Sequence, residues 1–454
     1  MSVEVEVISR EMVKPSSPTP RHLRHYHLSF IDQITPQINN SMVYFFTADS
    51  VTNKFNVNEA SDVLKKSLSQ VLTHYYPLAG RLMTDNLVVE CNDEGVPYIE
   101  TKVRCRLSHV TDDPSPADFS KLLPYDMDEV VDTVLGVQFN VFDCGGIAVG
   151  VSLTHKIADA LSHFQFIKTW AAVTRGGPEP VRTHFQSSSL FPTKDLSGYD
   201  PNTHIGQHKA VGKRFAFEAS VIESLRTKYS RKLSEGQKLP SRVEVLSTFL
   251  FNRFVAATKE EGDNKIHLVT STVNLRTRMD PPLPEYAFGN YYWYVQMFPT
   301  LDKKGESDDF FGRQLREEIT KVDNDFIVKL RESKEWNPNR EDMAKAIEKG
   351  ELVPVAFTSL CRFPVYEVDF GWGNPTWTGP PTWKFKNVIV FKDTKSGGGI
   401  EAYVNLTKDD MAKFERDEEL LAHVPVSSST SSTKSKGYTL VTLNGPSHLS
   451  HPAL

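Results

Sequence analysis

Apolar residues recur at helical spacing in two stretches of the N-terminal half. In the first stretch they are Val63, Leu64, Leu68, Val71, Leu72 and Tyr75, with Pro77 closing the run. In the second they are Leu161, Phe164, Ile167, Trp170 and Ala171. Apolar positions three and four residues apart fall on one face of a helix. Each stretch therefore predicts an amphipathic helix packed against a core, and the first helix ends before its proline.

Between these helices the pattern changes to alternation. The apolar residues are Val137, Phe139 and Val141 before a turn at 143–146, and Ile147, Val149, Val151 and Leu153 after it. Successive side chains of a strand point to opposite faces, so the pattern predicts a β-hairpin with one apolar face. The next side chain on that face is His155, where the second strand stops. We predict that a rigid strand end presents this histidine just before a helix.

Further elements alternate between the two types. A capping box formed by Ser241 and Glu244 begins another predicted helix. We predict strands at 3–7, 266–273, 291–297, 386–391 and 400–406, strand-like segments within 87–154, and a last helix at 408–423. The mixture indicates an α/β protein.

The chain divides at a segment without periodicity. Residues 186–210 are rich in Pro, Ser, His and Asp, which predicts a crossover linker between an N-terminal domain at 1–185 and a C-terminal domain at 211–425. Two domains also suit a length of 454 residues. The Ser/Thr-rich tail at 426–454 is predicted to be mobile.

Composition narrows the class of function. The net charge of −5 opposes a nucleic-acid partner, which would need a concentrated basic face. The four cysteines show no Cys-x-x-Cys pair or metal-ligand spacing, which favours a reducing compartment and no metal. No run reaches the roughly 18 apolar residues of a membrane span, and the N-terminus does not resemble a secretory signal. We expect a cytoplasmic protein that acts on a small molecule and not at a membrane.

The candidate chemistry begins with a histidine followed four residues later by an aspartate. Phosphate-binding loops, nucleophile elbows and His-Glu-x-x-His motifs are absent from the sequence. The His-x-x-x-Asp pattern occurs twice, at His109/Asp113 and at His155/Asp159. His109 enters a polar turn and is interpreted as a solvated loop residue. His155 leaves an apolar strand, which suits a functional side chain but equally a buried structural histidine.

A second motif lies near the C-terminus, where residues 369–373 read Asp-Phe-Gly-Trp-Gly. By itself this segment is a glycine-punctuated aromatic turn, for which a structural role is the simpler interpretation. In that role Asp369, Gly371 and Gly373 shape the turn.

Together, HKIADA at 155–160 and DFGWG at 369–373, in this order and about 200 residues apart, resemble the two hallmark motifs of the plant BAHD acyltransferase family. Further segments that resemble it are YPLAGRL at 76–82, SRVEVLSTFLF at 241–251 and VNLRTRMDPPLPEYAFGN at 273–290. The resemblance extends to about residue 423. It is greatest to the vinorine synthase-like branch of alkaloid and terpenoid O-acetyltransferases.

The resemblance implies a two-domain fold like that of chloramphenicol acetyltransferase, with mixed sheets and an active-site channel between the domains. Acyl-CoA, most simply acetyl-CoA, would enter the channel as a co-substrate from one side and an alcohol from the other. No permanently bound cofactor or metal is implied, and a monomer is expected.

The resemblance also implies roles for individual residues. His155 would be the general base that accepts the proton of the alcohol. Asp159 falls where an aspartate caps a helix start, and the resemblance pairs it with Arg276, so both would position His155. Trp372 would support the oxyanion. Ser241 and Arg242 would contact coenzyme A at a helix N-terminus.

Three functions are compatible with these residues. The leading one is acetyl transfer from acetyl-CoA to a hydroxyl of an alkaloid or terpenoid alcohol. In the second, the same fold acylates a simple alcohol or an amine. In the third, the chain is an inactive family member that only binds, which the presence of both motifs opposes.

Overall fold

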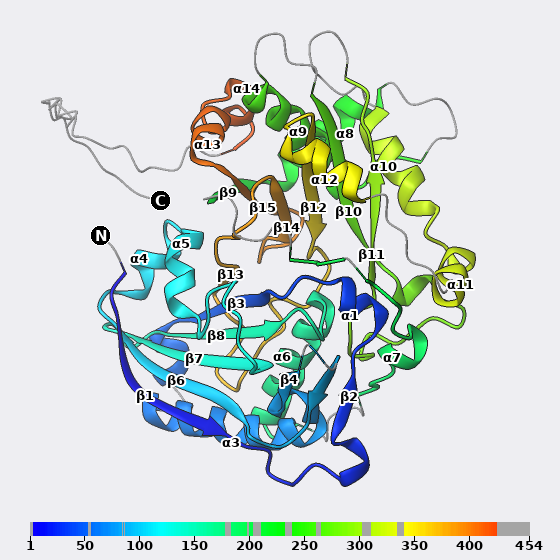
Figure 1. The fold of residues 1–454 in the computed structure, drawn as a ribbon. Helices are drawn as coiled ribbons and strands as arrows, with labels where there is room; N and C mark the ends of the chain where they lie inside the picture. Colours follow the sequence, from blue (N-terminus) through cyan, green and yellow to red (C-terminus); the bar gives the residue numbers. More distant parts are fainter. Residues whose placement is uncertain are drawn as a thin grey trace, which may run out of the picture.

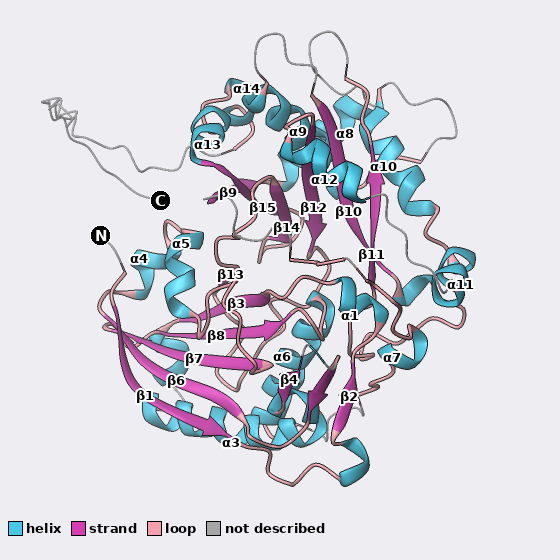
Figure 2. Ribbon diagram, viewed as in Figure 1, coloured by secondary structure: helices cyan, strands magenta, loops and turns pink. Residues whose placement is uncertain are grey.

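The computed structural model describes residues 3–52, 56–83, 85, 87–177, 183–197, 199–202, 210–231, 238–259, 265–301, 310–333 and 340–424. The chain forms two halves that each contain a six-stranded sheet, and a three-stranded sheet lies beside the first (Figure 1). Both halves combine strands and helices, as Figure 2 shows. This agrees with the predicted α/β class.

The N-terminal sheet has the strand order β1-β6-β7-β8-β3-β13. Its strands are β1 (Val5–Val13), β3 (Asn39–Phe46), β6 (Val96–Val103), β7 (Leu135–Phe142), β8 (Ile147–Thr154) and β13 (Trp377–Gly379). β6 and β7 pair in parallel and the other neighbours are antiparallel, so the sheet is mixed. The predicted hairpin is present as β7 and β8.

Two helices cover one face of this sheet. These are α3 (Val57–His74) and α6 (Ala160–Thr174), which lie against each other and match the two helical patterns of the sequence. Their apolar stripes bury against the odd-numbered residues of β7 and β8 in one core. The other elements of this half are η1 (Arg21–Leu23), β2 (His25–His27), α1 (Phe30–Ile34), α2 (Ala48–Thr52), η2 (Tyr76–Ala79), β4 (Arg81–Met83), β5 (Val88–Glu90), α4 (Leu107–Thr111), α5 (Pro116–Phe119) and η4 (Ser120–Leu122).

The C-terminal sheet has the order β11-β10-β12-β14-β15-β9. Its strands are β9 (Ala210–Phe217), β10 (Ile266–Asn274), β11 (Tyr292–Met297), β12 (Leu352–Ser359), β14 (Val388–Asp393) and β15 (Ile400–Thr407). The accompanying helices are α7 (Ser187–Leu190), α8 (Ala219–Ser230), α9 (Arg242–Thr258), η5 (Arg276–Arg278), α10 (Phe310–Thr320), α11 (Asn324–Glu332), α12 (Arg340–Glu348), α13 (Lys408–Phe414) and α14 (Glu418–Leu421). A second core lies between this sheet and helices that include α9, which is buried along most of its length.

The two halves exchange short segments, which a division at 186–210 does not anticipate. β13 belongs to the C-terminal half of the sequence but pairs with β3 at the edge of the N-terminal sheet. In the opposite direction, Phe30, Ile31 and Ile34 of α1 lie in the core of the C-terminal half. The sequence segment 186–210 contains α7, and Phe191 after it also joins that core. Each half therefore completes the other.

Several sequence predictions differ from the structure. The predicted helix at 408–423 is two helices, because Asp417 accepts a hydrogen bond from the Leu420 N–H (2.8 Å) and starts α14 as an N-cap. His109 is exposed as expected but lies in the short helix α4 and not in a loop. The predicted mobile tail at 426–454 lies outside the described residues.

Gly150 allows the strand that leads to His155 to pack closely. An added Cβ at this position of β8 would lie 2.0 Å from the backbone oxygen of Leu122. A backbone atom cannot rotate away as a side chain can, so η4 and β8 approach this closely only with a glycine here.

We expect Gly150→Ala to lower the free energy of unfolding by about 1–3 kcal/mol, the usual cost of overpacking a tight interior. Gly146→Ala in the same hairpin is the matched control, because its added Cβ would first meet side-chain atoms of Leu107 at 3.1 Å. Thermal unfolding monitored by circular dichroism measures both variants. Equal midpoints for the two variants would contradict the close approach.

Candidate active site

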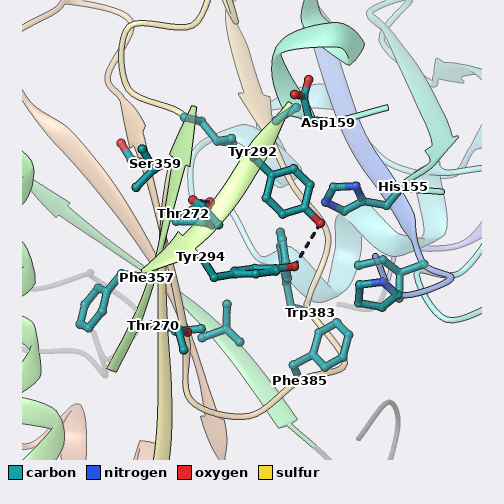
Figure 3. Close-up of a pocket in the computed structure, with 18 of the residues that line it drawn as sticks. His155, Asp159, Thr270, Thr272, Tyr292, Tyr294, Phe357, Ser359, Trp383 and Phe385 are labelled. Atoms are coloured by element: carbon teal, nitrogen blue, oxygen red, sulfur yellow. Dashed lines mark hydrogen bonds between the residues drawn. The ribbon is translucent and has the colours of Figure 1, made fainter. Parts of the chain in front are cut away.

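The backbone of His155 is held from two directions at the end of β8. Its N–H donates to the Ile38 carbonyl oxygen (2.7 Å), and its own carbonyl accepts from Asn290 Nδ2 (2.7 Å). The ring is left to face open space, beside the Tyr292 ring at a centroid distance of 5.4 Å (Figure 3). The sequence prediction of a histidine presented from a strand end agrees with this geometry.

His155 lines two cavities. The larger, of about 570 Å³, has a mostly apolar lining from both halves that includes Pro36, Ile38, Leu161, Thr270, Thr272, Tyr292, Tyr294, Phe357, Ser359, Trp383 and Phe385 (Figure 3). The smaller, of about 80 Å³, lies between β3, α6 and the segment after β13. The residues that line both are His155, Ala160, Thr358, Leu360 and Trp383. His155 therefore stands where the two spaces meet.

Burial sets the protonation of this ring. Removal from water lowers the pKa of the His155 imidazole below its ordinary value of 6.5, although nearby Asp159 and the Asn290 side chain oppose the shift. The ring is therefore neutral near pH 7, the form that can accept a proton. Nδ1 is buried and makes no hydrogen bond of normal geometry with the described residues.

Asp159 is the N-cap of α6 and is paired with Arg276. Its carboxylate accepts from the Ser162 N–H (2.9 Å) and the Tyr291 N–H (3.0 Å). Arg276 donates to both carboxylate oxygens, from Nη1 at 2.7 Å and Nη2 at 3.0 Å, and also to the Ala287 carbonyl. Burial opposes ionisation of Asp159, but Arg276 and the N–H donors hold its pKa below the ordinary value. The pairing implied by the family resemblance is thus present, and the carboxylate points away from the His155 ring (Figure 3).

A second buried polar group was missed by sequence reasoning. Asn290 Nδ2 donates to Asp32 Oδ1 (2.7 Å) as well as to the His155 carbonyl. Burial raises the pKa of Asp32 to about 6 against the effect of its hydrogen bonds. Asn290 is the last residue of the segment at 273–290, which resembles the acyltransferase family. That resemblance was the signal in the sequence that could have pointed to this residue.

Lys156 was also missed, because lysine is ordinarily a surface residue. Its buried ammonium group donates to the carbonyls of Asp32 (2.9 Å), Gln33 (3.2 Å) and Thr35 (2.7 Å) at the C-terminal end of α1. Burial lowers its pKa to about 8. The C-terminal end of a helix carries partial negative charge and therefore binds a cation favourably. Because Lys156 directly follows His155, this contact joins α1 to the strand end that presents the histidine.

The Asp-Phe-Gly-Trp-Gly segment forms a tight turn away from both cavities. Asp369 Oδ1 accepts from the N–H groups of Gly371 and Gly373, each at 2.7 Å, and both glycines have positive φ (109° and 94°). Trp372 packs edge-on against Phe46 at 5.9 Å. It is not among the lining residues of either cavity. The geometry fits a structural turn, and oxyanion support by Trp372 stays a prediction.

Ser241 and Arg242 also lie apart from the two cavities. Ser241 caps α9 in a capping box with Glu244, as predicted. Arg242 pairs with Asp393 Oδ1 (3.0 Å) and donates to the Gly398 carbonyl (2.9 Å). Their contact with coenzyme A stays a prediction.

The described residues offer neither a metal site nor a membrane-spanning helix. They contain no cluster of three or more His, Cys, Asp and Glu side chains suited to a metal ion. None of the described helices is long and apolar enough to cross a membrane.

Comparison with known proteins agrees with this fold. Residues 3–421 match the model of the Transferase family. The chain is 37% identical to limonoid 21-O-acetyltransferase of Melia azedarach over 93% of this chain and 98% of that one. It is 34% identical to salutaridinol 7-O-acetyltransferase of Papaver somniferum over 91% and 97%. The crystal structure of vinorine synthase superposes with a TM-score of 0.75 at 32% identity, covering 93% and 98%.

The family match, the relatives and the fold thus define an acyltransferase of the two-domain, chloramphenicol acetyltransferase-like type. The chain belongs to the BAHD acyltransferase family, in the branch similar to vinorine synthase.

We expect Arg276→Lys to lower both stability and activity. A single ammonium group cannot make the fork of bonds to Asp159 and the neighbouring carbonyls, so part of a buried charge pair is lost, at about 3 kcal/mol. Arg278→Lys is the matched control, because the Arg278 guanidinium donates to the carbonyl oxygens of Ile319 and Val322. Thermal unfolding and acyl-transfer rates are measured for both. A larger loss in the control would contradict the importance of the pair.

Proposed function

We propose that this protein transfers an acetyl group from acetyl-CoA to a hydroxyl group of an alkaloid or terpenoid alcohol, with His155 as the general base. The observation that carries the proposal is a neutral imidazole at the junction of two cavities between the halves. The relatives named above, which are acetyltransferases of a limonoid and of salutaridinol, support the choice of acyl group and acceptor class.

The reaction follows from the state of the ring. His155 accepts the proton of the hydroxyl group as its oxygen attacks the thioester carbonyl carbon. The tetrahedral intermediate then collapses, the carbon–sulfur bond breaks, and the thiolate takes the proton from the imidazolium. We propose Nε2 as the accepting atom, because Nδ1 is buried within the protein.

The remaining roles are part of the same proposal. Asp159 and Arg276 position His155, and placement matters because a small displacement of a catalytic base can cost much of the rate. Trp372 supports the oxyanion, and Ser241 and Arg242 contact coenzyme A. We further propose a cytoplasmic monomer; the four cysteines are free thiols, which supports a reducing compartment.

The size of the larger cavity favours a bulky acceptor over a simple one. A space of about 570 Å³ lies within the range of pockets that enclose drug-sized molecules. The decisive screen supplies acetyl-CoA with a limonoid alcohol, an alkaloid alcohol, menthol, hexanol and a primary amine, followed by mass spectrometry. Acetylation of only hexanol or the amine would favour the second candidate function.

We expect His155→Ala to abolish thiol release from acetyl-CoA in the presence of an accepted alcohol, with a loss of at least about 100-fold, as for removal of a general base. The matched control is His109→Ala, which changes the exposed histidine of the second His-x-x-x-Asp pattern. The control is expected to retain wild-type rates in a thiol-trapping assay. Unchanged thiol release by His155→Ala would show that another group is the base.

The dependence of kcat/KM on pH below neutrality tests the protonation state of the His155 ring. The folded pKa of His155 is below 6.5, so the base is neutral above that value and is lost only when pH falls through the lower pKa. We expect kcat/KM to be flat near neutral pH and to fall with an apparent pKa below 6.5. Circular dichroism at each pH separates this effect from acid unfolding. A fall centred above 6.5 while the protein stays folded would contradict the assignment.

A further inference from the structure

Two tyrosine hydroxyl groups meet inside the larger cavity, beside the proposed base. Tyr292 and Tyr294 are two residues apart on β11, so their side chains leave the same face of the C-terminal sheet. Both line the cavity of about 570 Å³, and the Tyr292 ring lies next to the His155 ring. Their hydroxyl oxygens are 3.0 Å apart, and Figure 3 shows the two side chains converging there. The reaction proposed above uses neither hydroxyl group.

A third hydroxyl group fixes the direction in which these groups donate. Thr35 directly follows α1, and its side-chain oxygen lies 2.7 Å from the Ile31 carbonyl oxygen and 2.8 Å from the Tyr292 hydroxyl oxygen. A hydroxyl group has one hydrogen, and a carbonyl oxygen can only accept. The hydrogen of Thr35 therefore lies on the bond to Ile31. The hydrogen between Thr35 and Tyr292 must then come from Tyr292.

The same reasoning applies to the next contact. Tyr292 donates its single hydrogen to Thr35, so the hydrogen between the two tyrosines comes from Tyr294. The O–H bond of Tyr294 is thereby directed at the protein. Toward a molecule in the cavity its oxygen presents lone pairs and not a hydrogen. With this polarity it accepts a hydrogen bond from a hydroxyl or N–H group and disfavours a carbonyl or ether oxygen.

Tyr294 is also the member of this chain that a bound molecule reaches more easily. It is half-buried, whereas Tyr292 is 8% exposed. Its neighbour in register on β10 is Thr272, whose hydroxyl group is bonded to that of Thr358 (2.9 Å). Most of the remaining lining is apolar. A few placed polar groups in an apolar pocket fix the orientation of a ligand and select among ligands.

The place of Tyr294 in the sheet favours the acceptor alcohol over coenzyme A as the donor. Both substrates have suitable chemistry, because the pantetheine arm carries amide N–H groups. The proposed coenzyme A contact Arg242 is paired with Asp393 at the end of β14. Tyr294 is on β11 at the edge of the sheet, with β10 and β12 between it and β14.

We propose that Tyr294 accepts a hydrogen bond from a second hydroxyl group of the acceptor and thereby selects diols over the corresponding ethers and ketones. This inference rests on the proposed acetyl transfer and specifies the acceptor class. Tyr294 is a specificity-determining residue and takes no part in proton transfer. Thr35 acts through Tyr292 and is a positioning residue, because it sets the direction of donation along the chain.

The test measures kcat/KM of the wild type and of Tyr294→Phe on matched acceptors. One set is p-menthane-3,8-diol and its 8-methyl ether. The other is the alcohol acetylated fastest in the screen and analogues in which its second hydroxyl group is methylated or oxidised to a ketone. The wild type is expected to prefer the diol in each accepted set. Tyr294→Phe is expected to lose about 3- to 10-fold on the diol alone, the effect of one neutral hydrogen bond.

The matched control is Tyr286→Phe, which removes the hydroxyl group of an exposed tyrosine outside the cavity lining. It is expected to keep the wild-type preference. The thermal midpoint of Tyr294→Phe is expected to stay close to that of the wild type, because Tyr292 still donates to Thr35.

Thr35→Val reverses the polarity of the chain and gives a second, independent test. Without an oxygen on this side chain, Tyr292 donates to Tyr294, and the hydrogen of Tyr294 becomes available to the cavity. The ether and the ketone are then expected to gain relative to the diol by a similar factor. Lost packing alone would lower the rates on all acceptors equally. Thr35→Ser, which keeps a hydroxyl group, is expected to keep the preference for the diol.

The contrary outcomes are distinct. Equal losses of Tyr294→Phe on diol, ether and ketone would show a structural role for the hydroxyl group. A raised KM for acetyl-CoA with an unchanged acceptor preference would assign the contact to the pantetheine N–H groups. A wild type that acetylates the ether or ketone as fast as the diol, or whose fastest acceptor has no second hydroxyl group, would overturn this inference and leave acetyl transfer standing. If the wild type acetylates no alcohol, the proposed function fails and this inference fails with it.

Discussion

The buried charge pair between Asp159 and Arg276 fixes the geometry on which the site depends. Asp159 begins α6 in the N-terminal half, and Arg276 follows β10 in the C-terminal half. Removing two charges from water costs several kcal/mol for each ion, and only well-made bonds offset that cost. Here the bonds are a two-pronged contact and further backbone partners. Any other arrangement of the halves would leave a charge buried and unpaired, so the pair favours one relative position.

The Asp159–Arg276 pair positions His155, although the His155 ring itself stays uncharged. A carboxylate next to an imidazole ordinarily raises the pKa of the ring, and Asp159 acts in this direction, but removal of the ring from water has the larger effect. Burial therefore dominates and the ring stays neutral. Lys156 and Asn290 hold the backbone on either side of the ring through α1 and Asp32. These polar contacts therefore hold the main chain around His155. The imidazole remains available to contact the substrates.

The sequence predicted those features of the fold that a local pattern of residues controls. Alternation gave β7 and β8 and the orientation of His155, and the position of Asp159 after the strand gave its N-cap role. β12 was missed because Pro354 interrupts its apolar run, yet the structure tolerates it since pairing with β14 starts only at Ala356. Lys156 was missed because only the fold brings three carbonyl oxygens to it. Contacts between distant segments, such as β13 with β3, have no local signature.

The start of α6 links the position of the proposed base to the junction of the halves. Asp159 is engaged there by Arg276 and by backbone N–H groups, and it can vary little without breaking that junction. His155 lies four residues earlier, at the end of β8, where the Ile38 carbonyl and the Asn290 side chain hold its backbone. The contacts that hold the two halves together therefore also fix the backbone on both sides of the proposed base.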